Sequence, residues 1–99
     1  MGLKIEWSEN AEQDIRHIFK RVKKKTKSEN LARNVISDIY DAGINIHYVK
    51  QYQVDEFLGE PYRRMVVRHF KIIYKPVNDD EIKILQVFDT YQNPLKLRK

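Results

Sequence analysis

The chain has 99 residues, of which 41% are hydrophobic and 33% are charged. This length supports one modest hydrophobic core, so we expect a single domain over residues 1–99. Cysteine is absent, which excludes disulfides, thiolate zinc sites and cysteine nucleophiles. No apolar run approaches the length of a membrane span, and the first residues lack the core of a signal peptide. We therefore expect a cytoplasmic protein with no membrane partner.

The charge is unevenly distributed along the chain. Residues 1–61 contain ten Lys and Arg against ten Asp and Glu, whereas residues 62–99 contain nine against four. The whole net charge of +5 therefore lies in the C-terminal part. A basic patch on a small domain commonly binds nucleic acid or an acidic protein segment. The alternative is a solvated surface whose charge maintains solubility, and charge alone favours neither.

The first third of the chain predicts a strand followed by a helix. Residues 3–7 alternate between apolar and polar side chains, which indicates a short, half-buried strand. Ser8 is a candidate N-cap. An apolar stripe at helical spacing follows and runs into the basic residues 20–25, where cations favour a helix C-terminus. The stripe consists of Ala11, Ile15, Ile18, Phe19 and Val22.

A second helix is predicted directly after a short break at residues 26–27. Ser28 is its candidate N-cap, and apolar residues continue at helical spacing as far as residue 46 or 47. Gly43 weakens this helix by roughly 1 kcal/mol relative to Ala, and it offers a place where a neighbouring element can approach closely. Two helices with so short a connection should form an antiparallel hairpin.

The next segment predicts a loop and then a strand pair. Residues 50–61 have no clear period and indicate a loop. Residues 62–76 have the composition of a strand, but they are too many for a typical one. A break near Arg68 and His69 would divide them into strands over 62–67 and 70–75.

The last part of the chain predicts one more strand. Asn78, Asp79 and Asp80 form a clear turn signal. Residues 81–89 follow as a strand with mostly buried apolar side chains. Pro94 ends regular sheet structure, and a frayed or short helical tail follows it.

The order of elements is therefore one strand, two helices, a loop and three strands. The natural solution is an α+β fold in which the helical hairpin packs on one face of a three-stranded antiparallel sheet. The N-terminal strand cannot stand alone and must join that sheet, for which an edge is one position.

This order, with several matching stretches, resembles the RelE/ParE family of toxins from type II toxin–antitoxin systems. The strongest match is residues 69–75, where a basic residue precedes two apolar residues and a tyrosine. The resemblance implies a growth-inhibiting toxin that a cognate antitoxin neutralises. RelE-like members cleave messenger RNA in the ribosomal A site without a metal, whereas ParE-like members poison DNA gyrase. The other matching features are Trp7, Ala11, Asp14-Ile15, Ala32, Leu58, Pro61, residues 62–67 and residues 85–89.

Metal-free RNA cleavage needs proton transfer at two oxygens and a cation that stabilises the phosphate. By resemblance, Lys71 stands where RelE-like enzymes place an essential arginine, and it would contact the scissile phosphate as a point charge. Arg64 and Arg68 are candidates to bind phosphates beside it, with Lys75 as a further nucleic-acid-binding residue. Arg63 is a weaker partner because it lies on the opposite strand face from Arg64. The alternative is that each is simply a solvated side chain of the sheet.

Two further residues are candidates for proton transfer. His69 carries an imidazole, a group that can shuttle protons, or it is a turn histidine that touches water. Tyr91 resembles the C-terminal aromatic residue that some family nucleases use to stack on a base or to transfer a proton; alternatively, it packs against the end of the sheet. The sequence departs from the nuclease pattern in that no histidine or arginine occupies residues 89–92. Asp89 would also repel phosphate unless a basic residue pairs with it.

No metal and no cofactor are expected. His17 and His47 do not stand at metal-ligand spacing. Glu56 and Glu60 in the loop are possible general bases, although many loop acids are merely solvated. The run Lys20–Lys27, with six basic residues in eight, is either a contact for ribosomal RNA or a solvated helix end.

Three functional hypotheses follow. The first is ribosome-dependent cleavage of messenger RNA, which the cationic strands favour. The second is a non-enzymatic poison of DNA gyrase acting through the helical hairpin and the tail, which the missing C-terminal histidine favours. The third is a small basic RNA-binding module. Both toxin hypotheses predict an antitoxin with an acidic or amphipathic segment that covers the basic sheet or the helical groove.

Overall fold

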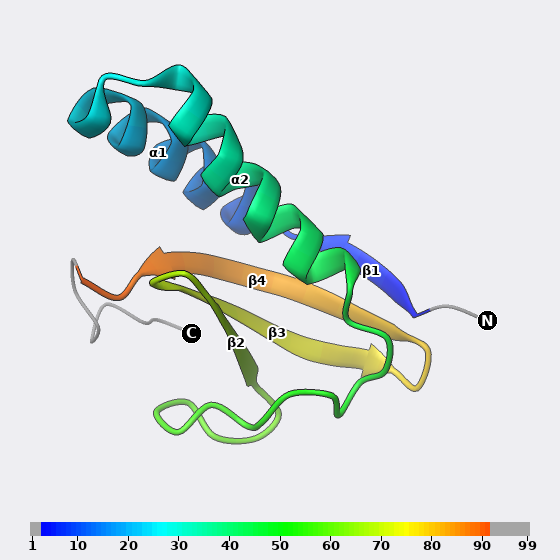
Figure 1. Cartoon of the computed structure of the whole chain (residues 1–99). Helices are drawn as coiled ribbons and strands as arrows, with labels where there is room; N and C mark the ends of the chain where they lie inside the picture. The colour runs from blue at the N-terminus through cyan, green and yellow to red at the C-terminus, as the bar shows by residue number, and fades with distance from the viewer. Residues whose placement is uncertain (1–2, 92–99) are drawn as a thin grey trace.

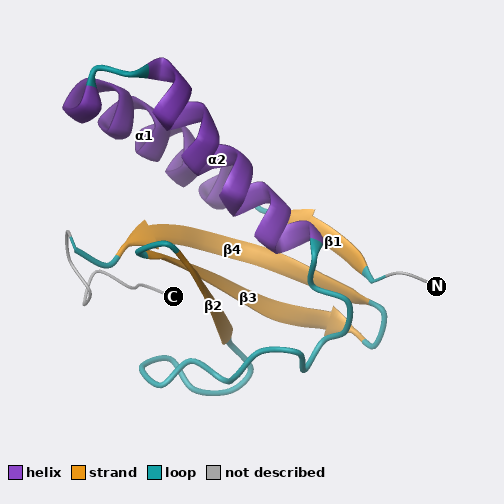
Figure 2. Ribbon diagram, in the orientation of Figure 1, coloured by secondary structure: helices purple, strands orange, loops and turns teal. Residues whose placement is uncertain are grey.

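The computed structural model describes residues 3–91. They form an α+β fold in which a helical hairpin packs on one face of a four-stranded sheet (Figures 1 and 2), as predicted. None of the helices in this part of the chain is long and apolar enough to cross a membrane. The elements are β1 (Lys4–Trp7), α1 (Glu9–Thr26), α2 (Glu29–Ile44), β2 (Arg63–Val67), β3 (Phe70–Asn78) and β4 (Glu81–Asp89).

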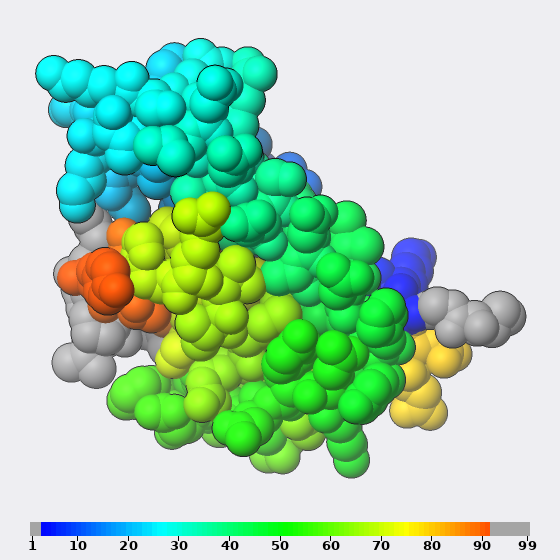
Figure 3. All heavy atoms as spheres, in the orientation of Figure 1, coloured from blue at the N-terminus to red at the C-terminus, as the bar shows by residue number. Residues whose placement is uncertain are grey.

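Both predicted N-caps are confirmed. The Ser8 hydroxyl accepts a hydrogen bond from the Ala11 N–H (3.0 Å), and the Ser28 hydroxyl accepts one from the Leu31 N–H (3.1 Å). Helix α1 ends at Lys27, a left-handed residue with φ of 57° whose N–H bonds to the Lys23 carbonyl. The antiparallel hairpin that results has a tip that stands clear of the sheet as a separate lobe (Figure 3).

Helix α2 ends at Ile44, before the predicted end at residue 46 or 47. The chain tightens there because the Ile46 N–H bonds to the Gly43 carbonyl, and the Ile46 side chain turns into the core. At Gly43 a neighbouring element, the side chain of Trp7, approaches the helix closely, as the sequence predicted. A Cβ built on Gly43 would lie 2.4 Å from Cζ2 of Trp7, whose ring packs against Tyr40 with centroids 4.8 Å apart.

The sheet has the order β1-β4-β3-β2 and is mixed rather than purely antiparallel. Strand β1 lies at an edge and runs parallel to β4, with Lys4 opposite Glu81 and Trp7 opposite Ile84. The Ser8 hydroxyl fastens the end of β1 by donating to the Leu85 carbonyl (2.9 Å). The prediction of a three-stranded antiparallel sheet therefore holds for β2, β3 and β4, and β1 adds a parallel fourth strand.

The predicted break at Arg68 and His69 is confirmed as the turn between β2 and β3. Arg68 adopts a left-handed conformation with φ of 56°, which takes the place of the missing glycine. Strand β3 continues to Asn78, although the sequence predicted an end at residue 75. The strand passes through Pro76 because a register shift between Pro76 and Asn78 accommodates the residue without an N–H.

The two faces of the sheet differ sharply in chemistry. Phe70, Ile72 and Tyr74 of β3 point into the core beneath the helices, and the residues between them point to the other side. We call that other side the open face. It carries Arg64, Lys71, Ile73, Lys75 and Lys83.

Candidate functional site

Lys71 lies on the open face but is only 8% exposed. Its Nζ lies 3.1 Å from Oδ1 of Asp55, in the loop that leads from α2 to β2. The same ammonium lies 5.0 Å from the ring centroid of Phe57 and 5.8 Å from that of Phe88. Both rings stabilise a buried cation through their π faces. The side chain predicted to meet a phosphate is therefore enclosed by one carboxylate and two aromatic rings.

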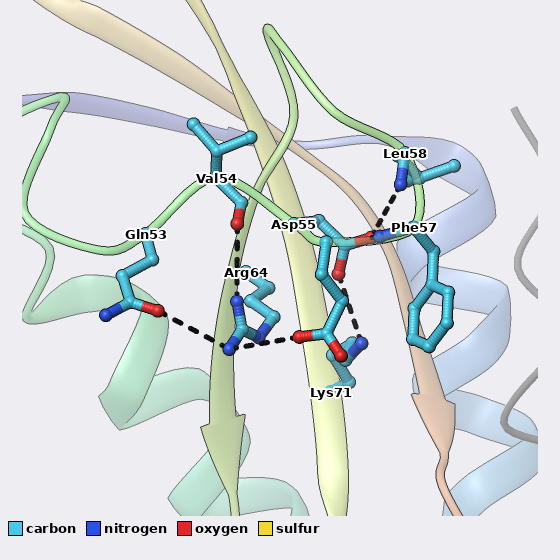
Figure 4. A network of polar contacts seen from close by, with 8 residues as sticks. Gln53, Val54, Asp55, Phe57, Leu58, Arg64 and Lys71 are labelled. Atoms are coloured by element: carbon cyan, nitrogen blue, oxygen red, sulfur yellow. Dashed lines mark hydrogen bonds and ion pairs between the residues drawn. The ribbon is translucent and has the colours of Figure 1, made fainter.

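Asp55 is the residue that sequence analysis missed. It is fully buried, and its Oδ2 accepts hydrogen bonds from the N–H groups of Phe57 (3.0 Å) and Leu58 (2.9 Å). Burial alone raises the pKa of Asp55, but the hydrogen bonds from Leu58, Lys71 and Phe57 outweigh it and hold that pKa below its usual value. Asp55 is thus an ionised carboxylate that organises the loop and neutralises Lys71 (Figure 4).

Arg64 is held by the same loop. Its Nη2 lies 3.4 Å from Oε1 of Glu56. Its Nη1 donates to the Val54 carbonyl (3.3 Å), a hydrogen bond drawn in Figure 4. Glu56, a candidate general base, is thus an ion-pair partner, whereas Glu60 is exposed nearby in the loop. Arg63 lies on the opposite face, as predicted, and donates to the Tyr52 carbonyl (2.7 Å).

Arg68 does not join this group. Its guanidinium bonds to the Asp38 carboxylate on α2, with Nη2 2.8 Å from Oδ2. Both side chains are exposed, so the pair is a surface contact that ties the turn between β2 and β3 to the helical hairpin.

The structure does bring His69 and Tyr91 together. Their rings stack with centroids 4.4 Å apart and an angle of 5° between their planes, and Tyr91 is 81% exposed. Asp89 lies beside them, 3.5 Å from Nε2 of His69 and 3.6 Å from Nη1 of Arg21. Arg21, from the basic run at the end of α1, supplies the cation that Asp89 was expected to need. A stacked ring pair, with Tyr91 exposed and His69 half-buried, thus marks this end of the sheet.

The remaining predicted residue, Lys75, lies four positions further along β3 than Lys71. It stands directly opposite Lys83 of β4, and both side chains line a hollow on the open face. Among residues 3–91, no group of three or more His, Asp or Glu side chains is arranged to hold a metal ion.

Comparison with known proteins identifies the fold. No protein-family model and no curated protein sequence matches the chain. A chain of the chromosomal ParDE TA system from P. aeruginosa is 16% identical and superposes with a TM-score of 0.71 over 88% of this chain and 95% of that chain. The chain has a RelE/ParE-type fold. A copper-bound mutant toxin from Helicobacter pylori is also 16% identical, with a TM-score of 0.45 over 92% of this chain and 98% of that chain.

Against this fold, the predicted site divides into two parts. Lys71 and Arg64 lie in one network with Asp55 and Glu56, and His69 lies with Tyr91 at the end of the sheet. Carboxylates neutralise the first part. In the second part, Tyr91 is exposed and His69 is half-buried beside Asp89.

Proposed function

We propose that this chain is the toxin of a toxin–antitoxin pair and that it acts by binding a protein target, DNA gyrase, rather than by cleaving RNA. The fold, shared with a chain of a ParDE toxin–antitoxin system, supports the toxin role. The single observation that carries the choice of mechanism is the buried ion pair between Lys71 and Asp55.

Cleavage of the RelE type needs a cation that can reach the scissile phosphate. Lys71 would first have to leave Asp55, a carboxylate with no exposed surface, and the two rings that enclose its ammonium. Removing one partner from such a buried pair costs about 3–5 kcal/mol. Binding to a protein target does not require this ion pair to break, because the helical hairpin can form the interface while Lys71 stays paired with Asp55.

Ribosome-dependent cleavage of messenger RNA is the second candidate, and the stacked rings of His69 and Tyr91 favour it. An imidazole can move protons near neutral pH, and an exposed phenol ring can stack on a base. Asp89 pairs with Arg21 and therefore presents less negative charge to a phosphate. This mechanism would place the chemistry at the end of the sheet and leave Lys71 a structural residue.

The proposed partner in the cell is a cognate antitoxin. An apolar groove runs between the two helices, lined by Ile15, Phe19 and Ile36, with Arg16 and Lys20 at its rim. An amphipathic segment with acidic residues would bury its apolar side there and pair with the two cations.

Two assays on the same purified protein separate the mechanisms. The first measures supercoiling of relaxed plasmid by DNA gyrase, and the second maps messenger RNA ends by primer extension in a defined translation extract. The proposal expects inhibited gyrase and intact message. Discrete ribosome-dependent cuts with unaffected gyrase would overturn it.

A double variant, His69→Gln with Tyr91→Ala, serves as the internal control. It should leave gyrase inhibition intact because both side chains lie at the solvent-exposed end of the sheet. The same double variant should abolish message cleavage if the second candidate is correct.

A further inference from the structure

Two lysines face each other on the open face without acidic partners. Lys75 of β3 is directly opposite Lys83 of β4, and both are half-buried. Side chains in such positions have Cβ atoms about 5 Å apart, and like charges there are unfavourable. Neither lysine forms an ion pair with another residue in the described range 3–91. The two lysines therefore concentrate positive charge that no ion pair within the described residues neutralises.

The nearest acidic position on the neighbouring strand is Glu6, which is opposite Lys83 in the register of β1 and β4. Glu6 is exposed and forms no ion pair with Lys83 in this part of the chain. Glu6 weakens the positive potential on the β1 side of Lys83, whereas Lys75 lies on the β3 side.

The lysine pair borders a hollow of about 420 Å³. This volume lies within the range of about 300–1,000 Å³ that is typical of small-molecule sites, and it far exceeds the roughly 30 Å³ of a single water. Leu58 and Leu85 supply apolar surface, Tyr62 contributes an aromatic ring, and Asn10 adds an amide. A ligand for this hollow should combine an anionic group with a flat, largely apolar body that has polar edges.

We propose that the hollow binds a nucleoside monophosphate. The phosphate lies between the Lys75 and Lys83 ammonium groups and relieves their mutual repulsion. The base lies over Leu85 beside the Tyr62 ring, where stacking is tolerant of base identity. Asn10 offers one donor and one acceptor to the edge of the base. This site adjoins the Lys71 network, with which it shares Leu58, and it does not depend on gyrase being the target.

The test begins with the wild-type protein and the four common ribonucleoside monophosphates as probes. Two-dimensional ¹H–¹⁵N NMR should show shifts for amides near residues 8–10, 73–75 and 83–86, with no change along the outer face of α2. Adenosine and inorganic phosphate, which each carry half of the ligand, should bind at least about tenfold more weakly than AMP. No shift of these amides at about 10 mM nucleotide would overturn the proposal.

Matched variants assign the charges. Lys75→Gln and Lys83→Gln should each weaken AMP binding by about tenfold, whereas Lys83→Arg should retain it. Lys50→Gln removes the same charge from a loop residue outside the hollow and should bind as the wild type does. Binding that is equal in all four variants would show that the lysine pair is not the phosphate site.

The same chemistry can come from a free nucleotide or from one unit of a nucleic-acid strand. Short RNA oligonucleotides with and without a 5′-phosphate distinguish these sources. If the phosphorylated strand binds more tightly and Lys83→Gln removes this advantage, the site exists and its ligand is one unit of an RNA strand. If mononucleotides bind and oligonucleotides do not, the site exists and its ligand is a free nucleotide.

Discussion

The Lys71 ammonium lies 3.1 Å from the Asp55 carboxylate, and this pair joins β3 to a loop sixteen residues earlier in the chain. Arg64 also anchors the loop, through Glu56 and the Val54 carbonyl, whereas Phe57 is exposed and Leu58 is half-buried. The pair therefore holds the loop against the sheet, and with it the wall of the hollow that Tyr62 and Leu58 form.

Removing either member of this pair should destabilise the protein strongly. We expect Asp55→Ala and Lys71→Met each to lower the free energy of unfolding by about 3–5 kcal/mol, because each leaves an uncompensated buried charge. The double variant should lose less than the sum of the two. Urea denaturation measures all three. Arg68→Ala, which breaks an exposed pair, is the control and should cost no more than about 1 kcal/mol; a similar loss in all variants would contradict a structural role for the buried pair.

The Asp55 carboxylate should make the free energy of unfolding depend on pH in the acidic range. Its folded pKa is below its value in the unfolded chain, so the unfolded state binds more protons as the pH falls. The stabilisation is present above about pH 4 and is lost as the pH falls through the folded pKa. Asp55→Asn should flatten the loss of stability between about pH 5 and 3 measured by urea denaturation. Glu29→Gln, at an exposed position, should leave most of the slope in place.

Gly43→Ala should destabilise the protein even though alanine favours helices. The gain in helix propensity is about 1 kcal/mol, but the new methyl group would lie 2.4 Å from Cζ2 of Trp7. Moving that ring out of its place should cost about 1–3 kcal/mol. Trp7 is the only tryptophan in the chain, so its fluorescence reports the displacement directly as a red shift.

Gly59→Ala is the matched control for this measurement. Gly59 has φ of 73°, and a methyl group added there would meet no atom within 4 Å. Alanine at this position should therefore strain the backbone without moving Trp7. An unchanged emission maximum in Gly43→Ala would show that the core accommodates the methyl group.

Lys27→Gly should stabilise the protein. Lys27 closes α1 in a left-handed conformation that costs a non-glycine residue about 1 kcal/mol, and it forms no ion pair among residues 3–91. We expect a gain of about 0.5–1 kcal/mol in the free energy of unfolding. Lys25→Gly, inside the last turn of the same helix, should instead lose about 1 kcal/mol. A loss in both variants would argue against the left-handed cap.

The helices and the turns could be predicted because their signals are local. Ser8 and Ser28 precede apolar stripes at helical spacing, and Asn78 begins a turn that its own side chain completes by accepting from the Asp80 N–H. The break at Arg68 was also predicted from strand length, although no glycine marks it. The predicted end at residue 75 was too early, because a local register shift lets β3 continue past Pro76.

The site could not be predicted in the same way because its partners are distant in sequence. Asp55 stands in a segment without periodicity, where an acidic residue is usually solvated, and nothing local indicates that it meets Lys71. Alternation did predict that Arg63 and Arg64 lie on opposite faces of β2. The opposition of Lys75 and Lys83 depends on the register around an irregularity between Ile73 and Tyr74, which the strand composition does not encode.

The parallel pairing of β1 with β4 has a consequence for synthesis of the protein. Strand β1 leaves the ribosome before the other described strands, yet its only partner in the sheet is the last of them. The Ser8 hydroxyl likewise cannot form its hydrogen bond until the Leu85 carbonyl, 77 residues later, has been synthesised. Contacts this distant in sequence form slowly and late. A nascent chain interrupted before β4 would leave the apolar side of β1 and the start of α1 uncovered, so the finished surface exists only once translation has passed β4.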